Sequence, residues 1–314
     1  MQMLLEKASD TELIQSPLNY TGGKFKLLPQ ILPLFPQNID IFVDLFCGGA
    51  NVGVNVQSNR TILNDTNDNL TYLFSMFKNF GDEFLSMIEE IIDTYGLSNT
   101  SKYGYEYYKC DSNTGLAPYN KDKFLKLRED FNKKTSLDYY YYAMLYTLIL
   151  YSFNNQIRFN SQGKFNLPAG KRDFNEKMKE KLKKFIARLE SKDYEFSNKD
   201  FREFDISKLN SNSFVYADPP YLITCATYNE QGGWSNKDEE DLLSFLDDLH
   251  NNNIKFALSN VLRSKNKENK ILINWARNNA DKYRVINLNY NYSNSNYQTK
   301  NKNSVTEEVL IINY

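Results

Sequence analysis

The feature that most constrains the fold is a short apolar run that ends abruptly in an acid and two prolines. Residues Phe214 to Ala217 combine aromatic and β-branched side chains, which is typical of a buried strand, and the sequence Asp-Pro-Pro-Tyr follows at 218–221. Proline cannot donate a ladder hydrogen bond, so the strand must stop there. In open α/β sheets the ligand crevice lies beyond the carboxyl ends of the strands. Asp218 and Tyr221 are therefore expected to face a site, although two prolines after a strand are also common in a plain turn.

Two more strands with informative ends are predicted earlier in the chain. Residues 39–46 are apolar and run into Cys47-Gly-Gly-Ala-Asn-Val-Gly53, after which a short helix is expected. Thr61 to Leu63 forms the next strand, which ends at Asn64-Asp65. A strand, a turn of small residues and an acid closing the following strand are the parts of the nucleotide-binding loop of a doubly wound sheet, where the acid hydrogen-bonds ribose hydroxyls. The glycine spacing is not that of a phosphate loop for ATP.

The single histidine limits the chemistry that the chain can perform. His250 lies in an acidic, helix-like segment and is expected to be a solvated surface residue, so Ser/His/Asp and Cys/His triads and most histidine-ligated metal sites are excluded. The cysteines at 47, 110 and 225 are widely spaced and form no Cys-x-x-Cys motif, which argues against a disulfide framework and a zinc site. No metal is expected.

Length and hydropathy favour a globular protein of two domains. The chain has 314 residues, of which 41% are hydrophobic. Its most apolar segment, Tyr139 to Phe153, is shorter than the roughly 20 residues of a membrane span and is predicted to be a buried helix. The first residues have no basic region followed by a long apolar run, so no secretory signal is expected and a cytoplasmic location is predicted.

Positive charge is concentrated in one part of a nearly neutral chain. Residues 154–190 hold ten Lys or Arg against four Asp or Glu, whereas the net charge of the whole chain is −1. A local excess of this kind suits a protein that grips a polyanion on one face, although a solvated helix face is the simpler explanation for Lys177 to Lys184.

A helix-rich insertion is predicted between the third strand and this basic segment. Helical spacing marks 70–80, 82–95, 121–133 and 137–153, whereas 96–119 is polar and is predicted to be a loop. The insertion ends in a hairpin pattern around Ser161-Gln-Gly163. Arginine pairs bidentately with guanine and asparagine with adenine, so its Arg and Asn side chains suit base edges. A polar surface hairpin is the alternative.

The remaining segments complete an α/β fold. A basic helix is expected over 175–189, a strand over 194–197 that ends near Asp200, an acidic helix over 236–250 and a strand over 254–260. Residues 283–290 are predicted to pair with 305–314, and the segment 222–234, which contains Tyr228 and Gly232-Gly233, is predicted to act as a lid. The expected fold is a doubly wound, mostly parallel, Rossmann-like sheet with an inserted helical domain. Its predicted boundaries are 1–67 and 173–314 for the sheet domain and 68–172 for the insertion.

Five motifs occur in the order found in Dam-type DNA adenine-N6 methyltransferases, and the chain resembles that family. They are Asn19-Tyr-Thr-Gly-Gly-Lys24, Phe42-Val-Asp-Leu-Phe-Cys-Gly-Gly49, Leu63-Asn-Asp-Thr-Asn67, Asp218-Pro-Pro-Tyr221 and Phe256-Ala-Leu-Ser-Asn260. The chain departs from the family pattern at Ala50, where the glycine-rich turn normally has its second glycine, and at Tyr20, where tryptophan is common. Ala50 narrows the turn, which puts the fit of a cofactor there in question.

The resemblance implies a role for each motif. In the family, the Asp218 carboxylate and the Pro219 carbonyl would accept the two hydrogens of the target amine, with Pro220 fixing the backbone and Tyr221 stacking on the base. S-adenosylmethionine is the implied cofactor. It would be held by Tyr20, Lys24, Phe46, Cys47, Gly48, Gly49, Asp65, Asp200 and Asp218.

Double-stranded DNA is the implied partner, with the target base flipped out of the helix. In the family's recognition hairpin, Arg158 would read a guanine, Asn160 would support it, and Phe153 and Asn154 would lie near the displaced base. Lys164, Lys171 and Arg172 are the other expected DNA contacts, the last two to phosphates.

The resemblance makes GATC the leading target sequence. A companion restriction endonuclease that acts on the same site is a further expected partner. The expected oligomeric state is a monomer or a weak dimer. Three alternatives remain open. Asp-Pro-Pro-Tyr also serves methylation of cytosine N4 or of RNA, and a catalytically inactive DNA-binding homologue is the non-enzymatic reading.

Overall fold

The computed structural model describes residues 12–20, 22–111, 113, 115–223, 233–289 and 306–314. In this part of the chain the strands form a single mixed sheet in the order β3-β2-β1-β4-β5-β8-β7, and β6 pairs with β5 off this path. Strands β1 to β5 are parallel, whereas β8 runs antiparallel to both of its neighbours. The strands are β1 (Ile39–Asp44), β2 (Ser58–Asn64), β3 (Asp193–Ser197), β4 (Phe214–Ala217), β5 (Lys255–Ser264), β6 (Lys267–Glu268), β7 (Arg284–Leu288) and β8 (Glu307–Ile312).

This order creates a topological switch point between β1 and β4. From β1 the chain proceeds outward to β2 and β3 on one side, and from β4 outward to β5 on the other. Loops at such a point diverge at the carboxyl ends of the strands and leave a crevice between them. The predicted doubly wound, mostly parallel sheet is confirmed.

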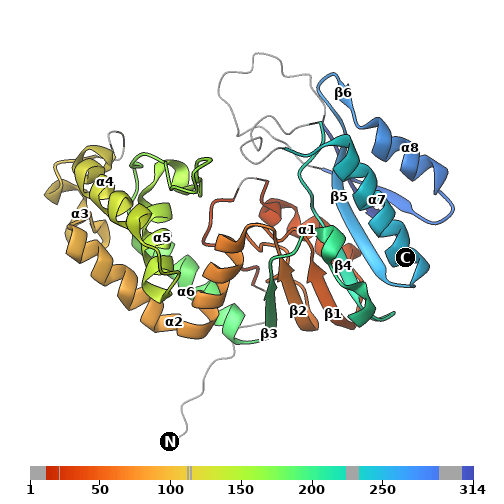
Figure 1. Cartoon of the computed structure of the whole chain (residues 1–314), viewed down its shortest axis with the longest axis horizontal. Coiled ribbons are helices and arrows are strands. Elements are labelled where there is room, and N and C mark those ends of the chain that lie inside the picture. Colours follow the sequence, from red (N-terminus) through yellow and green to blue (C-terminus); the bar gives the residue numbers. More distant parts are fainter. Residues whose placement is uncertain (1–11, 21, 112, 114, 224–232, 290–305) are drawn as a thin grey trace, which may run out of the picture.

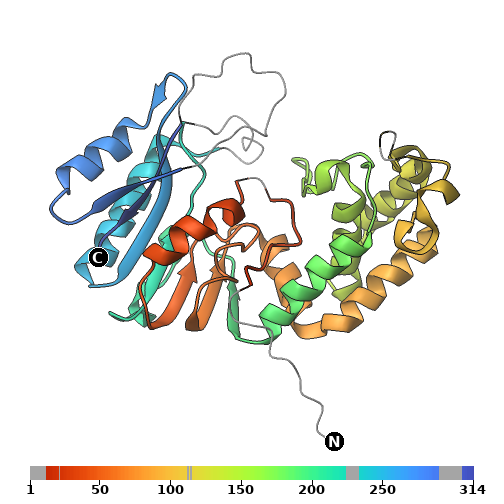
Figure 2. The same cartoon turned by 180° about the vertical axis from the view of Figure 1, so that it is seen from behind.

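Alternating apolar residues explain why both faces of the sheet are covered. On β1 and β4, Phe42, Phe214 and Tyr216 point to one face, where they pack with Leu28 and Ile31 of α1 (Leu28–Ile31). Side chains in a strand alternate between faces, so the intervening residues point the other way. They pack against α7 (Asn236–Asn251) and α8 (Lys270–Asn278). Figure 1 shows α7 and α8 over that face, and Figure 2 shows α1 over the other.

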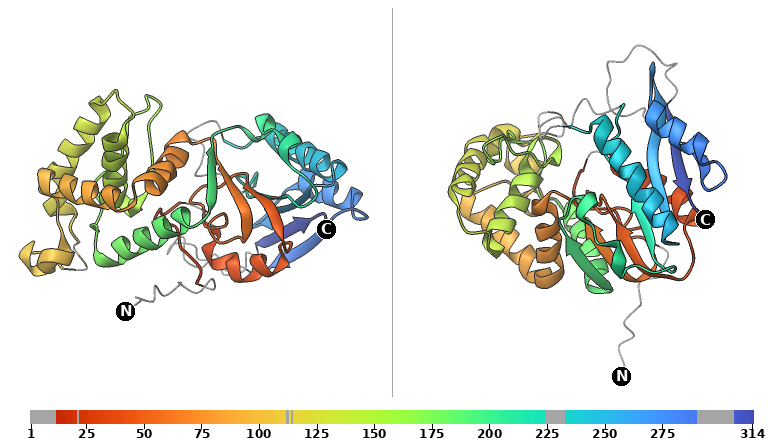
Figure 3. Two further views of the ribbon diagram at one scale, coloured as in Figure 1. Left: turned by 90° about the horizontal axis from the view of Figure 1, so that it is seen from below. Right: turned by 45° about the vertical axis from the view of Figure 1, so that its right-hand side comes forward.

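The helical insertion shares one hydrophobic core with the glycine turn and the β2–β3 edge of the sheet. It comprises α2 (Asp68–Tyr95), α3 (Thr100–Tyr107), α4 (Ala117–Lys133) and α5 (Tyr139–Tyr151), and α6 (Glu176–Glu190) packs against α2. Every residue of α5 from Tyr142 to Tyr151 is buried, as expected for a helix that is apolar on all sides. Figure 3 shows these helices gathered beside β3, with α6 leading into that edge strand.

The long helix α2 joins two segments that the sequence predicts separately. Gly81 interrupts it with φ +40° and ψ −113°, and a Cβ at that position would contact Glu190. Residues 70–80 and 82–95 are therefore two helical segments with a kink at the glycine, as their spacing predicts.

Three expectations about local structure are wrong, and one helix was not predicted. Residues 96–119 are not all loop, because the Asn99 side chain accepts a hydrogen bond from the Lys102 amide and starts α3. No helix follows Gly53; the chain makes turns and enters β2 directly. Helix α8 was not expected. His250 is half-buried rather than solvated, with its ring 5.4 Å from that of Tyr283.

The short 3₁₀ helices η1 (Lys24–Leu27), η2 (Leu32–Leu34), η3 (Phe153–Asn155), η4 (Phe201–Glu203) and η5 (Ile206–Lys208) connect these elements. Across the ranges that the structure describes, no helix combines the length and the apolar character needed to cross a membrane.

Candidate functional site

The carboxyl ends of β1 and β4 meet at the switch point. Asp44 lies opposite Tyr216 in the parallel ladder, and the Leu45 amide donates a 2.9 Å hydrogen bond to the Tyr216 carbonyl. Beyond this pair, β1 continues into the glycine turn and β4 into the Asp-Pro-Pro-Tyr sequence. The fold therefore brings Asp218 and the glycine turn together, as their positions at strand ends predict.

Four polar side chains form a buried cluster at the end of β4. The Lys24 ammonium lies 2.8 Å from Asp218 Oδ2 and 3.9 Å from Glu308 Oε1. The Tyr221 hydroxyl donates to Asp218 Oδ1 at 3.0 Å and lies 3.3 Å from Glu308 Oε1. Lys24 also donates to the Gly22 carbonyl at 3.2 Å and lies 4.9 Å from the centre of the Tyr221 ring. Lys24, expected beside the cofactor, is thus placed against the Asp218 carboxylate.

Burial governs the charge of Asp218. Loss of solvent raises the pKa of this carboxyl above its ordinary value, and the Lys24 ammonium and the Tyr221 hydroxyl oppose that rise. Its side chain keeps an exposed fraction of 18%, whereas that of Lys24 keeps 6%. Asp218 is therefore more accessible than Lys24 to a ligand at the end of β4.

The glycine turn is tied to the end of β2 through Asp65. Asp65 Oδ2 accepts a 2.9 Å hydrogen bond from the Gly48 amide, and Oδ1 accepts one of 2.9 Å from the Asn67 amide. Burial raises the pKa of this carboxyl, and both hydrogen bonds oppose the rise. Asp65 thus shapes the turn, and because each carboxylate oxygen has two lone pairs it retains capacity for a further donor.

The Tyr20 ring lies directly over the turn. A Cβ added to Gly48, whose φ is +47°, would approach Tyr20 Cδ1 to 2.8 Å, so only glycine fits there. Ala50 has φ +58° and is fully buried. A left-handed conformation costs a residue with a Cβ about 1–2 kcal/mol, so Ala50 occupies a position that favours the glycine expected there.

Aromatic side chains flank the turn on its other side. The rings of Phe46, Phe201 and Trp234 lie 5.7 to 5.9 Å apart in a mutually contacting trio. Trp234 Nε1 donates to the buried Glu239 carboxylate at 2.6 Å, which fixes its ring. Asp200 precedes Phe201, and its carboxylate binds Arg202 at 3.1 Å. The buried thiol of Cys47 has a pKa well above its ordinary value because of desolvation.

The predicted hairpin forms a tight turn that is hydrogen-bonded to side chains of α4. Phe159 and Phe165 make an isolated antiparallel bridge. Asn132 of α4 binds both sides of the Phe165 backbone: its Oδ1 accepts from the amide at 2.9 Å and its Nδ2 donates to the carbonyl at 3.0 Å. Arg128 donates to the Leu167 carbonyl at 2.8 Å.

The polar side chains of the hairpin have distinct partners. Arg158 Nε donates to Asn166 Oδ1 at 2.8 Å, and none of the described residues accepts a hydrogen bond from its terminal nitrogens. Asn160 Oδ1 accepts from the amides of Gln162 and Lys164, so it shapes the turn. Lys164 is exposed.

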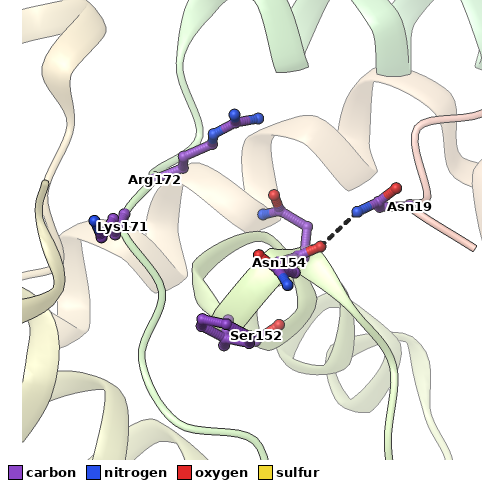
Figure 4. Close-up of a pocket in the computed structure, with 7 residues that line it drawn as sticks. Asn19, Ser152, Asn154, Lys171 and Arg172 are labelled. Atoms are coloured by element: carbon purple, nitrogen blue, oxygen red, sulfur yellow. Dashed lines mark hydrogen bonds between the residues drawn. The ribbon is translucent and has the colours of Figure 1, made fainter. Parts of the chain in front are cut away.

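A pocket of about 420 Å³ lies between the hairpin region and the segment before the glycine turn (Figure 4). Asn19 Nδ2 donates to the Asn154 carbonyl across it at 2.7 Å. Phe153 is 49% exposed, and both Asn154 and Asn155 have positive φ angles. The pocket is lined by Asn19, Ser152, Phe153, Asn154, Asn155, Lys171 and Arg172.

Three residues with evident roles were not found from the sequence. Glu308 stands in an apolar strand with no local motif. Asn132 lies within a helical pattern, and Asn166 follows the hairpin as one of many asparagines. Residues 224–232 of the predicted lid, which include Tyr228 and Gly232, lie outside the described residues. Among the residues that the structure describes, no group of three or more His, Cys, Asp or Glu is placed to hold a metal ion.

Comparison with known proteins agrees with this geometry. A family model described as D12 class N6 adenine-specific DNA methyltransferase matches residues 20–294. The chain is 42% identical to the modification methylase StsI of Streptococcus sanguinis, in an alignment that covers 98% of this chain and 44% of that protein. It is 41% identical to the type II methyltransferase M.FokI of Planomicrobium okeanokoites, with the same coverage. A DNA adenine methylase of Serratia marcescens is 28% identical over 68% of each chain.

The chain therefore belongs to the D12 class of N6 adenine-specific DNA methyltransferases. It spans less than half the length of StsI and M.FokI, the two relatives most similar among those named above.

Proposed function

We propose that the chain transfers a methyl group from S-adenosylmethionine to N6 of adenine in duplex DNA. The observation that carries the proposal is the position of Asp218: it ends β4 at the switch point of the sheet, with the Lys24 ammonium and the Tyr221 hydroxyl on its two oxygens. The membership of the chain in the D12 class supports the choice of base.

Adenine N6 is a poor nucleophile because its lone pair is delocalised into the ring. The Asp218 carboxylate and the Pro219 carbonyl would accept its two hydrogens and localise the lone pair on nitrogen. Tyr221 would stack on the base, and Pro220 keeps the backbone of this segment fixed, so the amine is aligned without a covalent adduct.

The glycine turn and its surroundings fit S-adenosylmethionine. Gly48 and Gly49 leave room for the Tyr20 ring, which would itself line the cofactor site, the aromatic trio offers an apolar surface for the adenine ring, and Asp65 has acceptor capacity for ribose hydroxyls. When bound, the cofactor supplies the methyl group. Tyr20, Phe46, Cys47, Asp65 and Asp200 would hold it, with Lys24 and Asp218 nearest the reacting end.

The target base must leave the helix to reach Asp218, at a cost of about a few kcal/mol. We propose that the helical domain, with predicted bounds 68–172, presents Arg158 to a guanine, Phe153 and Asn154 to the gap in the duplex, and Lys164, Lys171 and Arg172 to the backbone. The positive charge of residues 154–190, which include the hairpin, supports binding of a polyanion.

We propose GATC as the first target to test, in a cytoplasmic protein that acts as a monomer or weak dimer. The names of StsI and M.FokI, a modification methylase and a type II methyltransferase, support a companion restriction endonuclease. The alternative substrates, cytosine N4 and RNA, have no separate support in the structure.

Sequencing of DNA treated with the purified protein and S-adenosylmethionine tests the proposal, because single-molecule reads show the modified base and its context together. We expect N6-methyladenine within one short sequence. Detection of methylcytosine in the same assay would show that the target base is cytosine and not adenine. Absence of any modified base, with cofactor and DNA both bound, would identify an inactive homologue.

The cofactor site has a separate test. Asp65→Ala should weaken S-adenosylmethionine binding by about 1–3 kcal/mol, since the ribose hydroxyls lose an acceptor and the Gly48 amide loses its partner. Calorimetry on both proteins measures the change, and equal affinity would remove Asp65 from the site.

A further inference from the structure

A second carboxylate lies behind the proposed catalytic one. Glu308 belongs to β8, the antiparallel strand of the sheet, and its side chain has an exposed fraction of only 1%. It shares the face of the sheet with Leu310 and Ile312, which are apolar. Placing a carboxylate on this face costs free energy unless it has partners. Lys24 and Tyr221, the two groups that bind Asp218, are those partners.

The Tyr221 hydroxyl has one proton and two carboxylates within reach. It lies 3.0 Å from Asp218 and 3.3 Å from Glu308, so it can donate fully to only one of them at a time. The Lys24 ammonium is closer to Asp218, at 2.8 Å, than to Glu308, at 3.9 Å. A shift of about one ångström would bring the ammonium to Glu308, while the Gly22 carbonyl holds its other side.

This arrangement bears on how Asp218 receives its ligand. Both oxygens of Asp218 already accept hydrogen bonds, and a carboxylate that is tightly paired with an ammonium is a weaker acceptor for a third donor. Each oxygen keeps a lone pair for a target amine, but it is a strong acceptor only if Lys24 and Tyr221 have another acceptor. Leaving either of them buried without a partner would cost about 1–3 kcal/mol or more.

We propose that Glu308 is a positioning residue that takes over Lys24 and the Tyr221 hydroxyl when an amine binds Asp218. The inference rests on the proposed function and deepens it. Glu308 does not touch the substrate. It keeps the lysine and the tyrosine satisfied in both arrangements, so that Asp218 is released as an acceptor without loss of the buried hydrogen bonds.

Glu308→Gln tests this role, because glutamine keeps the shape and removes the charge that attracts Lys24. We expect kcat for methyl transfer to fall about 10- to 100-fold, with KM for DNA and for S-adenosylmethionine changed less than threefold, as is typical when a partner of a reacting group is lost. Glu308→Asp, which retains the charge, should recover part of the rate. Equal kcat in Glu308→Gln and wild type would overturn the proposal.

The control is the neighbouring residue on the same strand. Glu307 is half-buried, points to the other face of the strand and pairs with Arg263 at 2.7 Å. Glu307→Gln is the same chemical change one residue away, so it should leave kcat unchanged. A similar loss in both variants would show that β8 is merely sensitive to lost charge.

A second measurement does not depend on turnover. Glu308 is a negative charge near Asp218, so its removal should lower the pKa of the Asp218 carboxyl. Carboxyl ¹³C signals of aspartate-labelled protein report this, with the Asp218 signal assigned by its absence in Asp218→Asn. We expect its titration to move to lower pH in Glu308→Gln and to stay in place in Glu307→Gln. An unmoved titration refutes the proposal even if the wild type proves inactive on DNA, an outcome that would refute only the proposed function.

Discussion

The end of the parallel sheet and the hairpin of the helical domain are built on opposite principles. At the sheet, Asp44, Asp65, Asp218, Glu308 and Lys24 are ionisable groups held in or near the core. At the hairpin the shape is set by neutral amides from Asn132, Asn160 and Asn166, and the cationic side chains extend outward.

The difference teaches how one chain can serve two tasks. A buried ionisable group is strongly affected by its neighbours, so the sheet end is suited to control protons and hydrogen bonds. Neutral amides provide most of the hydrogen bonds that hold the hairpin, so Lys164 and the terminal nitrogens of Arg158 remain available for an anionic partner. The sheet end should therefore respond to pH and the hairpin to salt and sequence.

The largest effect is expected at Asp218. Asp218→Ala should lower single-turnover methylation by about a thousandfold, because the amine loses its charged acceptor, while DNA and cofactor still bind. Asp218→Asn, which keeps the shape around Lys24, should be similarly impaired. The exposed Asp205, which only caps η5, provides the control in Asp205→Ala. Near-normal rates in the Asp218 variants would exclude this acid from the chemistry.

The pH response of the sheet end has a defined sign. Burial raises the pKa of Asp44 from 3.8 to about 8, with the Gly53 amide opposing and Asp218 adding to the rise. The folded state therefore holds a proton that the unfolded state has lost between these values, and the stabilisation from Asp44 is complete below pH 3.8 and lost as the pH rises to 8. In this window Asp44 should lower the free energy of unfolding by up to about 1.4 kcal/mol per pH unit, and Asp44→Asn should abolish that slope.

Urea denaturation between pH 5 and pH 8 measures this slope. Asp40→Asn is the control on the same strand, because Asp40 is exposed to solvent and hydrogen bonds from Asn210 and Asn59 lower its pKa. Parallel pH profiles for wild type and Asp44→Asn would contradict the prediction.

Sequence discrimination should depend on one arginine of the hairpin. Arg158→Ala should cost about 1–3 kcal/mol of discrimination at a single base pair, because the bidentate contact to guanine is lost. Arg158→Lys keeps the charge but not the fork, so it should bind DNA well and discriminate poorly. Methylation rates on duplexes with each base pair of the site replaced in turn test both variants. A mutant as selective as wild type would show that another residue reads the guanine.

The smallest effect concerns the phosphate contacts. Replacing both Lys171 and Arg172 by alanine should weaken binding to all sequences alike and reduce the slope of log K against log salt by about 1.8, or roughly 0.9 per phosphate. Titrations at several salt concentrations measure the slope. Lys133→Ala, whose lysine pairs with Glu129 at 2.7 Å, should leave it unchanged. A change restricted to one DNA sequence would contradict the assignment.

Strand ends and glycines made much of the sheet predictable. The apolar runs before Gly48 and Asp218 are local patterns, and each gives both the strand and the position where it stops. The pairing of 283–290 with 305–314 was also found, as β7 with β8. The helix α3 was not, because its start depends on the side chain of one asparagine within a polar segment.

The sequence indicates which residues belong to the candidate site better than it indicates which of them contact one another. The pairing of Lys24 with Asp218 joins residues far apart in the chain, and no local pattern encodes it. Glu308 illustrates the same limit, since an acid on the apolar face of a strand has no local explanation until its contact with Lys24 is known. The arrangement of Asn160 shows that residue type alone does not separate a base contact from a turn former.

The position of β8 also dictates an order of assembly. Among the described strands, β7 pairs with β8 alone, and β8 occupies the place between β5 and β7. During synthesis β7 therefore emerges without a strand to pair with, whereas the helices from α2 to α6 are contiguous in the chain and can pack as soon as they are made. Arrival of β8 gives β7 its pairing partner and delivers Glu308 to Lys24 in one event, so the nascent chain acquires the full charge cluster only when β8 joins the sheet.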